Sequence, residues 1–287
     1  MPDQRLFGVD EARAKLESLL LQPGRPWLIA IDGLGGLGKT SLAHALALAM
    51  LGSHRFYDVA WVSARQEEYL PEGVLRRVIQ PALTAQTFVD TLLTQLDPGL
   101  GLTRSGDEKQ AILSRWLKAK PYLVVVDNLE TAEDYQSLLP LLHQLANPTK
   151  FLLTTRSSLR TRANVHSYSL RGLNEEDTYA LLWYEAEVRG IAMLAQASPE
   201  SLGRIYQVVG GNPLALKLVA GQLSVLPLPQ VLDNLRRADT QSIEHLYLYM
   251  YWQAWEMLSE AGKQTLAVMP LAQEGTVGAS GRAAAVR

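Results

Sequence analysis

The chain has 287 residues, of which 47% are hydrophobic, so it can bury one large core or two to three smaller ones. Its formal net charge is −2, from 27 basic and 29 acidic side chains, and this balance does not support binding to nucleic acid. The absence of cysteine excludes disulfides, thiolate zinc sites and a cysteine nucleophile.

The first part of the chain alternates helical patterns with short apolar segments. The apolar segments predict strands at 27–31, 58–63, 122–126 and 151–154. The helical patterns predict helices at 10–21, 39–51, 110–120 and 132–145. Such alternation is typical of a parallel sheet covered by helices on both faces. We therefore expect an α/β domain at residues 1–170.

The strand pattern fades after Leu170, and helical periodicity dominates the rest of the chain. Helices are predicted at 175–189, 201–209, 214–223 and 230–237, which indicates a helical subdomain at residues 171–238. Two more helices, at 243–258 and 261–269, indicate the start of a third unit at residues 239–274. Residues 275–287 are rich in small side chains, and we expect a disordered tail.

Two other classes of protein find no support in the sequence. The N-terminus has no apolar signal core, and the longest apolar stretch, near residues 42–51, is interrupted by His44, so we expect a cytoplasmic protein with no membrane segment. The five histidines do not fall at metal-ligand spacing, so a metal site built from side chains alone is not expected.

A phosphate-binding motif joins the first predicted strand to the helix that follows. The segment Gly33-Leu-Gly-Gly-Leu-Gly38-Lys39-Thr40 fits G-x-x-x-x-G-K-[ST], the P-loop of nucleotide-binding proteins. Its glycines allow successive N–H groups and the helix N-terminus to face phosphates. Lys39 would then neutralise the β- and γ-phosphates, and the Thr40 hydroxyl would join the Mg²⁺ shell.

The same stretch also fits the G-x-G-x-x-G fingerprint of dinucleotide-binding folds, through Gly33, Gly35 and Gly38. Asp58 lies twenty residues after Gly38, near the spacing of the ribose-binding acid of that fold. That acid belongs at the end of the second strand, however, whereas Asp58 precedes the predicted strand. We therefore prefer the P-loop interpretation.

Polar residues follow two of the later predicted strands. Asp127 follows four apolar residues and would hold Mg²⁺ through water, as the Walker B acid does, although an acid at this place is also a common helix N-cap. Arg156 ends the next strand and could reach the γ-phosphate or be exposed to solvent. Because ligands bind at the carboxyl ends of strands in open α/β sheets, both residues are candidates for the site.

Together these segments resemble the NB-ARC group of STAND NTPases, the switch ATPases of apoptosis scaffolds, plant immune receptors and bacterial regulators. The resemblance covers about residues 6–270. Besides the P-loop it includes the segments 57–63 and 154–156, the second of which matches the sensor arginine, and the helical-subdomain segment Gly211-Asn-Pro213-Leu-Ala-Leu216. In that family the proline of the last motif packs on the adenine. Without the resemblance, residues 210–213 would be a turn between helices.

The resemblance also implies a set of site residues. Phe7 and Val9 are similar in place to the entry motif that frames the adenine, and Arg65 is similar in place to an arginine near the nucleotide. Lys39, Asp127 and Arg156 are the expected catalytic residues, and Thr40 with Asp127 is the expected metal site. The expected nucleotide contacts are Phe7, Val9, Gly33, Gly35, Gly36, Leu37, Gly38, Lys39, Thr40, Ser41, Arg156, Pro213 and Leu214.

Two departures from the family bear on the mechanism. Asn128 stands where the family often has a second acid, and the next carboxylate is Glu130, so we expect slow hydrolysis. At the adenine end, Val9 replaces a usual arginine of the entry motif, so the polar contribution of that arginine is missing. The resemblance also implies that residues 239–274 are an incomplete winged-helix unit, ending before the family's histidine motif.

Three functions remain open at this point. The first is an ATP/ADP switch with Mg²⁺, slow or regulated hydrolysis, and protein partners or self-association in the ATP state. The second is a nucleotide-stabilised interaction scaffold without significant turnover. The third is a ring-forming motor of the AAA type, for which Arg160 and Arg162 are the candidates for an arginine that acts on a neighbouring subunit.

Overall fold

The computed structural model describes residues 5–64, 67–69, 75–77, 83–97, 105–129, 132–161, 164–237 and 259–264. The chain divides into two compact units: Met1–Arg65 with Pro81–Leu232, and Gln66–Gln80 with Asp233–Arg287. In the second unit, β3 (Glu67–Tyr69) and β4 (Leu75–Arg77) form a two-stranded antiparallel sheet. Arg65, Glu130, Arg162, the tail and all but 259–264 of the expected winged-helix unit lie outside the described residues.

A five-stranded parallel sheet forms the centre of the first unit. Its strands lie in the order β2-β5-β6-β1-β7, and all their pairings are parallel. The strands are β1 (Leu28–Asp32), β2 (Asp58–Ser63), β5 (Tyr122–Leu129), β6 (Lys150–Thr155) and β7 (Val165–Ser169). The α/β class predicted from the sequence is thereby confirmed.

Successive residues of the central strands point to opposite faces of the sheet, and each face has its own core. Leu28 and Ala30 of β1 pack in one hydrophobic cluster, whereas Ile29 and Ile31 pack in the other. Every residue of β1 is buried. This explains the continuous apolar runs in the sequence, because a strand covered on both faces has no polar side.

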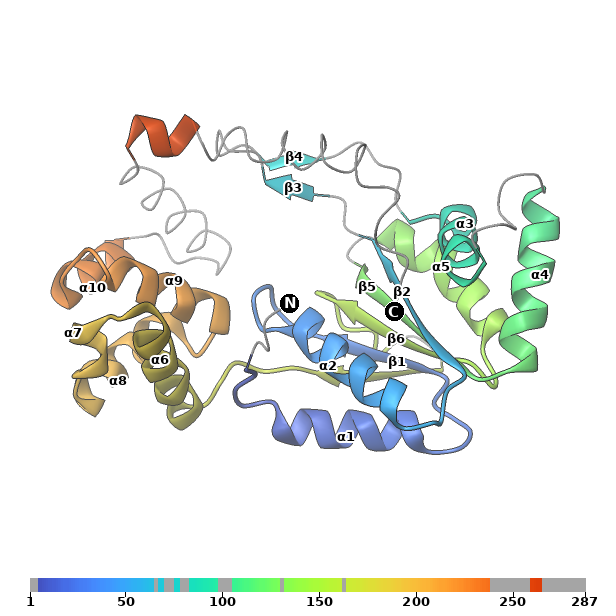
Figure 1. The fold of residues 1–287 in the computed structure, drawn as a ribbon, viewed down its shortest axis with the longest axis horizontal. Helices are drawn as coiled ribbons and strands as arrows, with labels where there is room; N and C mark the ends of the chain where they lie inside the picture. The colour runs from blue at the N-terminus through green and yellow to red at the C-terminus, as the bar shows by residue number, and fades with distance from the viewer. Residues whose placement is uncertain are drawn as a thin grey trace. The chain divides into compact units, whose positions relative to one another are not determined.

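Helices cover both faces (Figure 1). Residues of α1 (Asp10–Leu21) and α2 (Lys39–Gly52) belong to the cluster on one face. Residues of α3 (Ala85–Leu96), α4 (Gly106–Ala119) and α5 (Ala132–Leu145) belong to the cluster on the other. Ser105 begins α4 with a capping box, in which Ser105 and Glu108 satisfy each other's backbone N–H groups.

After the sheet, the part of the chain that the structure describes up to Arg237 is mainly helical. It forms α6 (Glu175–Arg189), α7 (Ala192–Ala195), α8 (Pro199–Val209), α9 (Pro213–Leu223) and α10 (Leu228–Arg237). Asn174, Ser198 and Asn212 cap the N-termini of α6, α8 and α9 through their side-chain oxygens. Within the described residues, no helix is long and apolar enough to cross a membrane. The domain boundaries predicted above stay a prediction.

Several elements differ from the sequence-based expectation. The strand expected at 122–126 continues to Leu129, through a register shift against β6 between Val126 and Leu129. β7, α3 and the short strands β3 and β4 were not predicted. The β7 sequence, Val-His-Ser-Tyr-Ser, is half-buried along its length, so it lacks the apolar run that revealed the inner strands.

Lys150, the first residue of β6, is completely buried. Its ammonium group donates to the carbonyl oxygens of Leu19 at 2.6 Å and Gln22 at 2.9 Å, at the C-terminal end of α1. Burial lowers the pKa of Lys150 from 10.5 to about 8. A neutral amine still has two N–H groups for the two carbonyls, so the contact with α1 does not need the charge.

This pKa predicts how stability depends on pH. Between pH 8 and about 10.5 the unfolded chain holds the Lys150 proton more tightly than the folded chain, so the free energy of unfolding should rise with pH there. Lys150→Met removes this contribution. We expect the difference in unfolding free energy between wild type and Lys150→Met, measured in urea, to grow in favour of wild type from pH 8 to pH 10. A constant difference would contradict the lowered pKa.

Candidate functional site

The loop between β1 and α2 wraps back on itself around Lys39. The Nζ atom of Lys39 donates to the carbonyl oxygens of Gly33 at 2.7 Å and Leu34 at 2.8 Å. Gly33 has a φ of +147°, and a Cβ there would lie 2.7 Å from the carbonyl oxygen of Leu170. Position 33 therefore requires glycine, both for its backbone angle and for the close approach of residue 170.

Asp127 lies next to this loop on β5 and is 7% exposed. Its Oδ1 atom accepts hydrogen bonds from the hydroxyl of Thr40 at 2.8 Å and from that of Thr154 at 2.5 Å. Thr40 lies in the first turn of α2 and Thr154 lies on β6, so three elements fix the carboxylate. The predicted pair Thr40 and Asp127 is brought together, and Thr154 joins it.

Asn128 occupies the irregular part of β5. Its φ is +67°, and its N–H donates to the Thr154 hydroxyl at 2.8 Å. Asparagine is one of the few non-glycine residues that adopt left-handed backbone angles readily. The chain turns here directly after the carboxylate, and Asn128 is one of the residues that line the cavity described next.

A cavity of about 370 Å³ lies beside the loop. Most of the residues expected to contact nucleotide line it: Phe7, Val9, Gly35, Gly36, Leu37, Gly38, Lys39, Thr40, Ser41, Arg156, Pro213 and Leu214. Gly33 and Asp127 are not among the lining residues. Gly33 is bonded to the lining residue Lys39, and Asp127 is bonded to the lining residue Thr40. Arg160, the candidate for action across subunits, is exposed and is not among the lining residues.

Seven further residues line the same cavity: Arg5, Leu6, Asn128, Thr154, Leu173, Leu181 and Lys217. Lys217 lies on α9, and its Nζ is 3.8 Å from a carboxylate oxygen of Glu185, which is nearly buried and is also bound by Arg189 at 2.7 Å. Sequence reasoning missed Lys217. It lies four residues after Pro213, so the helical repeat of α9 could have placed the two on one face.

The charge of the cavity is one-sided. Arg5, Lys39, Arg156 and Lys217 line it, and none of its lining residues that the structure describes is acidic. Basic groups together with backbone N–H groups of the loop favour an anion. Phe7, Val9, Leu173, Leu181 and Pro213 supply apolar surface in the same space, which suits a ligand with a planar apolar part and a charged part.

The turn before α9 touches the phosphate-loop segment directly. The Nδ2 atom of Asn212 donates to the carbonyl oxygen of Gly35 at 2.8 Å, and the N–H of Leu214 donates to that of Gly36 at 3.3 Å. The N–H of Leu173 donates to the Gly211 carbonyl oxygen at 2.8 Å. Three segments far apart in the sequence are thus joined by these hydrogen bonds.

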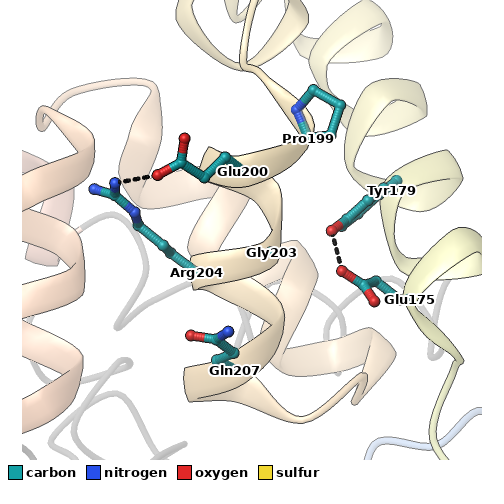
Figure 2. A pocket seen from close by; sticks show the side chains of 7 residues that line it. All are labelled: Glu175, Tyr179, Pro199, Glu200, Gly203, Arg204 and Gln207. Atoms are coloured by element: carbon teal, nitrogen blue, oxygen red, sulfur yellow. Dashed lines mark hydrogen bonds and ion pairs between the residues drawn. The ribbon is translucent and has the colours of Figure 1, made fainter.

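A second cavity, of about 620 Å³, lies between α6 and α8 (Figure 2). Its charged side chains already have partners: the Tyr179 hydroxyl donates to Glu175, and Glu200 pairs with Arg204 at 2.7 Å. The bond to the Glu175 carboxylate raises the pKa of Tyr179 to about 12. None of the predicted site residues lines this cavity, so its larger volume does not make it the better candidate.

The model of the NB-ARC domain matches residues 9–189. The chain belongs to the NB-ARC domain family. The match covers the sheet, the P-loop and α6, so the chain carries a nucleotide-binding module of this family.

This NB-ARC chain is similar to a plant protein in sequence. It is 30% identical over 223 residues to the disease resistance protein RPP13 of Arabidopsis thaliana, a match that covers 75% of this chain and 25% of that protein. The chain therefore spans about a quarter of the length of that curated relative.

Two solved structures share the fold. One is a Signal Transduction ATPase with Numerous Domains (STAND) protein with a tetratricopeptide repeat sensor from Pyrococcus horikoshii, with a TM-score of 0.51, 17% identity, and coverage of 91% of this NB-ARC chain and 35% of that chain. The other is Cdc6p from Pyrobaculum aerophilum, with a TM-score of 0.53, 14% identity, and coverage of 78% and 64%. At these identities the likeness concerns the fold alone.

Proposed function

We propose that this chain is the ATP/ADP-binding switch of a signalling ATPase, with slow or regulated hydrolysis of ATP. One observation supports the proposal: a single cavity is lined by the P-loop with Thr40, by Arg156 and by the Pro213 turn, and Asp127 is hydrogen-bonded to Thr40. A ligand in that cavity would touch the sheet and the helical part of the chain together. Its presence or loss would therefore shift the balance between closed and open arrangements.

The residues suggest a role for each end of the cavity. Lys39 and the N–H groups of the loop would bind the β-phosphate, and Arg156 would reach the γ-phosphate. Phe7, Val9, Pro213 and Leu214 would enclose the adenine. The ring of Phe7 packs against the ring of Tyr184, with centroids 5.4 Å apart, and this contact limits its movement.

The donor set beside the loop fits Mg²⁺. The Thr40 hydroxyl and the Asp127 carboxylate lie within hydrogen-bond distance of each other, and Mg²⁺ prefers oxygen ligands, with one or two carboxylates completed by water and substrate phosphates. Thr40 and Asp127 would supply two of the ligands, and water and the phosphates of the nucleotide would supply the others. When bound, the metal would neutralise phosphate charge.

Asn128 supports slow hydrolysis. It lines the cavity directly after Asp127, where a carboxylate would be placed to orient a water molecule, and a carboxamide cannot accept the proton of that water as a carboxylate does. Long residence of each nucleotide suits a protein that signals by its bound state. We extend the proposal to self-association or partner binding in the ATP state and to a cytoplasmic location.

The same residue favours one alternative, a scaffold that binds nucleotide without turnover. Titration calorimetry with ATP and ADP tests binding, and a wild-type chain that binds neither would overturn the proposed function. A phosphate-release assay then separates the two candidates. Steady release that is lost in Asp127→Ala supports the switch, whereas tight binding with no release supports the scaffold.

A further inference from the structure

Asn212 makes contacts that its place in a helix-joining turn does not require. It is completely buried. Its Oδ1 atom caps α9 by accepting from the N–H groups of Leu214 at 3.1 Å and Ala215 at 3.4 Å. Because the oxygen is used by these donors, the amide nitrogen is left to donate, and it donates to the carbonyl oxygen of Gly35.

This bond and its neighbour act on two consecutive peptide groups of the loop. The Asn212 amide donates to the carbonyl of the peptide between Gly35 and Gly36. The N–H of Leu214, shared with the Asn212 Oδ1 atom, donates to the carbonyl of the next peptide, between Gly36 and Leu37. In a planar trans peptide the C=O and N–H groups point in opposite directions. Fixing both carbonyls therefore also fixes the directions of the N–H groups of Gly36 and Leu37.

We propose that Asn212 is a positioning residue for the phosphate loop, which sets the directions of loop N–H groups from the first turn of α9. The inference rests on the proposed function in that the ligand is a nucleotide with a phosphate chain. The same turn carries Pro213 and Leu214, which line the other part of the cavity. Asn212 thus links the phosphate end of the site to its apolar end.

The chemistry explains why this position holds asparagine. The residue has to accept hydrogen bonds as an N-cap and donate one to a carbonyl in the same buried place. Aspartate and serine are equally good caps, but an aspartate carboxylate cannot donate and a serine side chain is shorter by one bond. The coupling works in both directions: a phosphate that orders the loop also favours the turn, because linkage is reciprocal.

The test is a comparison of two ligands on the full chain. Titration calorimetry with ADP and with adenosine is performed on wild type, Asn212→Asp and Asn212→Ser. We expect ADP affinity to fall by about tenfold in both variants, because one hydrogen bond to the loop is lost and the loop N–H groups no longer point at the phosphates. Adenosine affinity should stay within about twofold of the wild-type value. A purely structural role would lower both affinities by the same factor, and that result would overturn the proposal.

A matched control exists in the same unit. Asn174 caps α6 through its Oδ1 atom, which accepts from the N–H of Asp177 at 2.8 Å, and it is exposed. Asn174→Asp is the same substitution at a cap outside the cavity, and both affinities should be unchanged. If Asn212→Asp does not fold, Asn212→Ser decides.

A measurement without ligand separates this inference from the proposed function. Amide hydrogen exchange of the loop at residues 33–40 should be at least several-fold faster in Asn212→Ser than in wild type, and unchanged in Asn174→Asp. Unchanged exchange at the loop would overturn the role of Asn212 even if the wild type binds ADP. If the wild type binds neither ligand, the proposed function fails, and the exchange result still decides whether Asn212 orders the loop.

Discussion

Lys39→Ala should weaken the binding of ATP and ADP by about a hundredfold. Lys39 is one of four basic side chains in the cavity, and its Nζ atom already lies against the loop through its bonds to Gly33 and Leu34. A charge-assisted bond to phosphate is worth about 1.5–3 kcal/mol, and the alanine side chain cannot make one. Titration calorimetry measures the loss.

The control for this experiment is Lys15→Ala. Lys15 is an exposed lysine of α1 whose Nζ lies 5.5 Å from the ring centre of Tyr168, and it is not among the residues that line the cavity. Its removal changes net charge by the same amount without touching the site, so affinity should stay within about twofold. Equal affinity for ADP in Lys39→Ala and wild type would show that the loop does not hold the phosphates.

The elements that sequence reasoning located best are those whose signals are local. The helix predicted at 175–189 is α6 to the residue, because its N-cap Asn174 and its left-handed C-terminal glycine, Gly190, both belong to the local sequence. The P-loop is also local, since one short segment carries the glycines, the lysine and the threonine. For the same reason the strand at 58–63 was predicted correctly.

The parts that were missed depend on distant segments. Thr154 belongs to the segment that was expected at this edge of the sheet, but its bond to Asp127 on the adjacent strand was not predicted, because no local pattern in the sequence indicates that contact. Leu173, Leu181 and Lys217 reach the cavity because the helical part packs against the loop. The Asn212 amide is similar, since its acceptor, Gly35, is 177 residues away.

Gly211→Ala should destabilise the first unit far more than Gly210→Ala does. Both residues have a φ of +71°, so both substitutions incur the cost of a left-handed backbone, about 1 kcal/mol. At Gly210 a Cβ would meet nothing within 4 Å, but at Gly211 it would lie 2.2 Å from the carbonyl oxygen of Leu173. Backbone has to move to relieve that collision, and the move breaks the bond from the Leu173 N–H to the Gly211 carbonyl at 2.8 Å.

The adjacent pair provides its own matched control. We expect Gly210→Ala to lower the thermal midpoint by about 3 °C and Gly211→Ala by about 10 °C, from costs of about 1 and 3 kcal/mol in a unit of this size. Because residue 211 joins the segment at Leu173 to the Asn212 turn, Gly211→Ala should also reduce ADP affinity even at temperatures where the protein is folded. Similar thermal midpoints for the two variants would mean that the backbone at Leu173 can move aside at little cost in stability. The turn before α9 would then be a flexible connection and could not transmit the state of the phosphate loop.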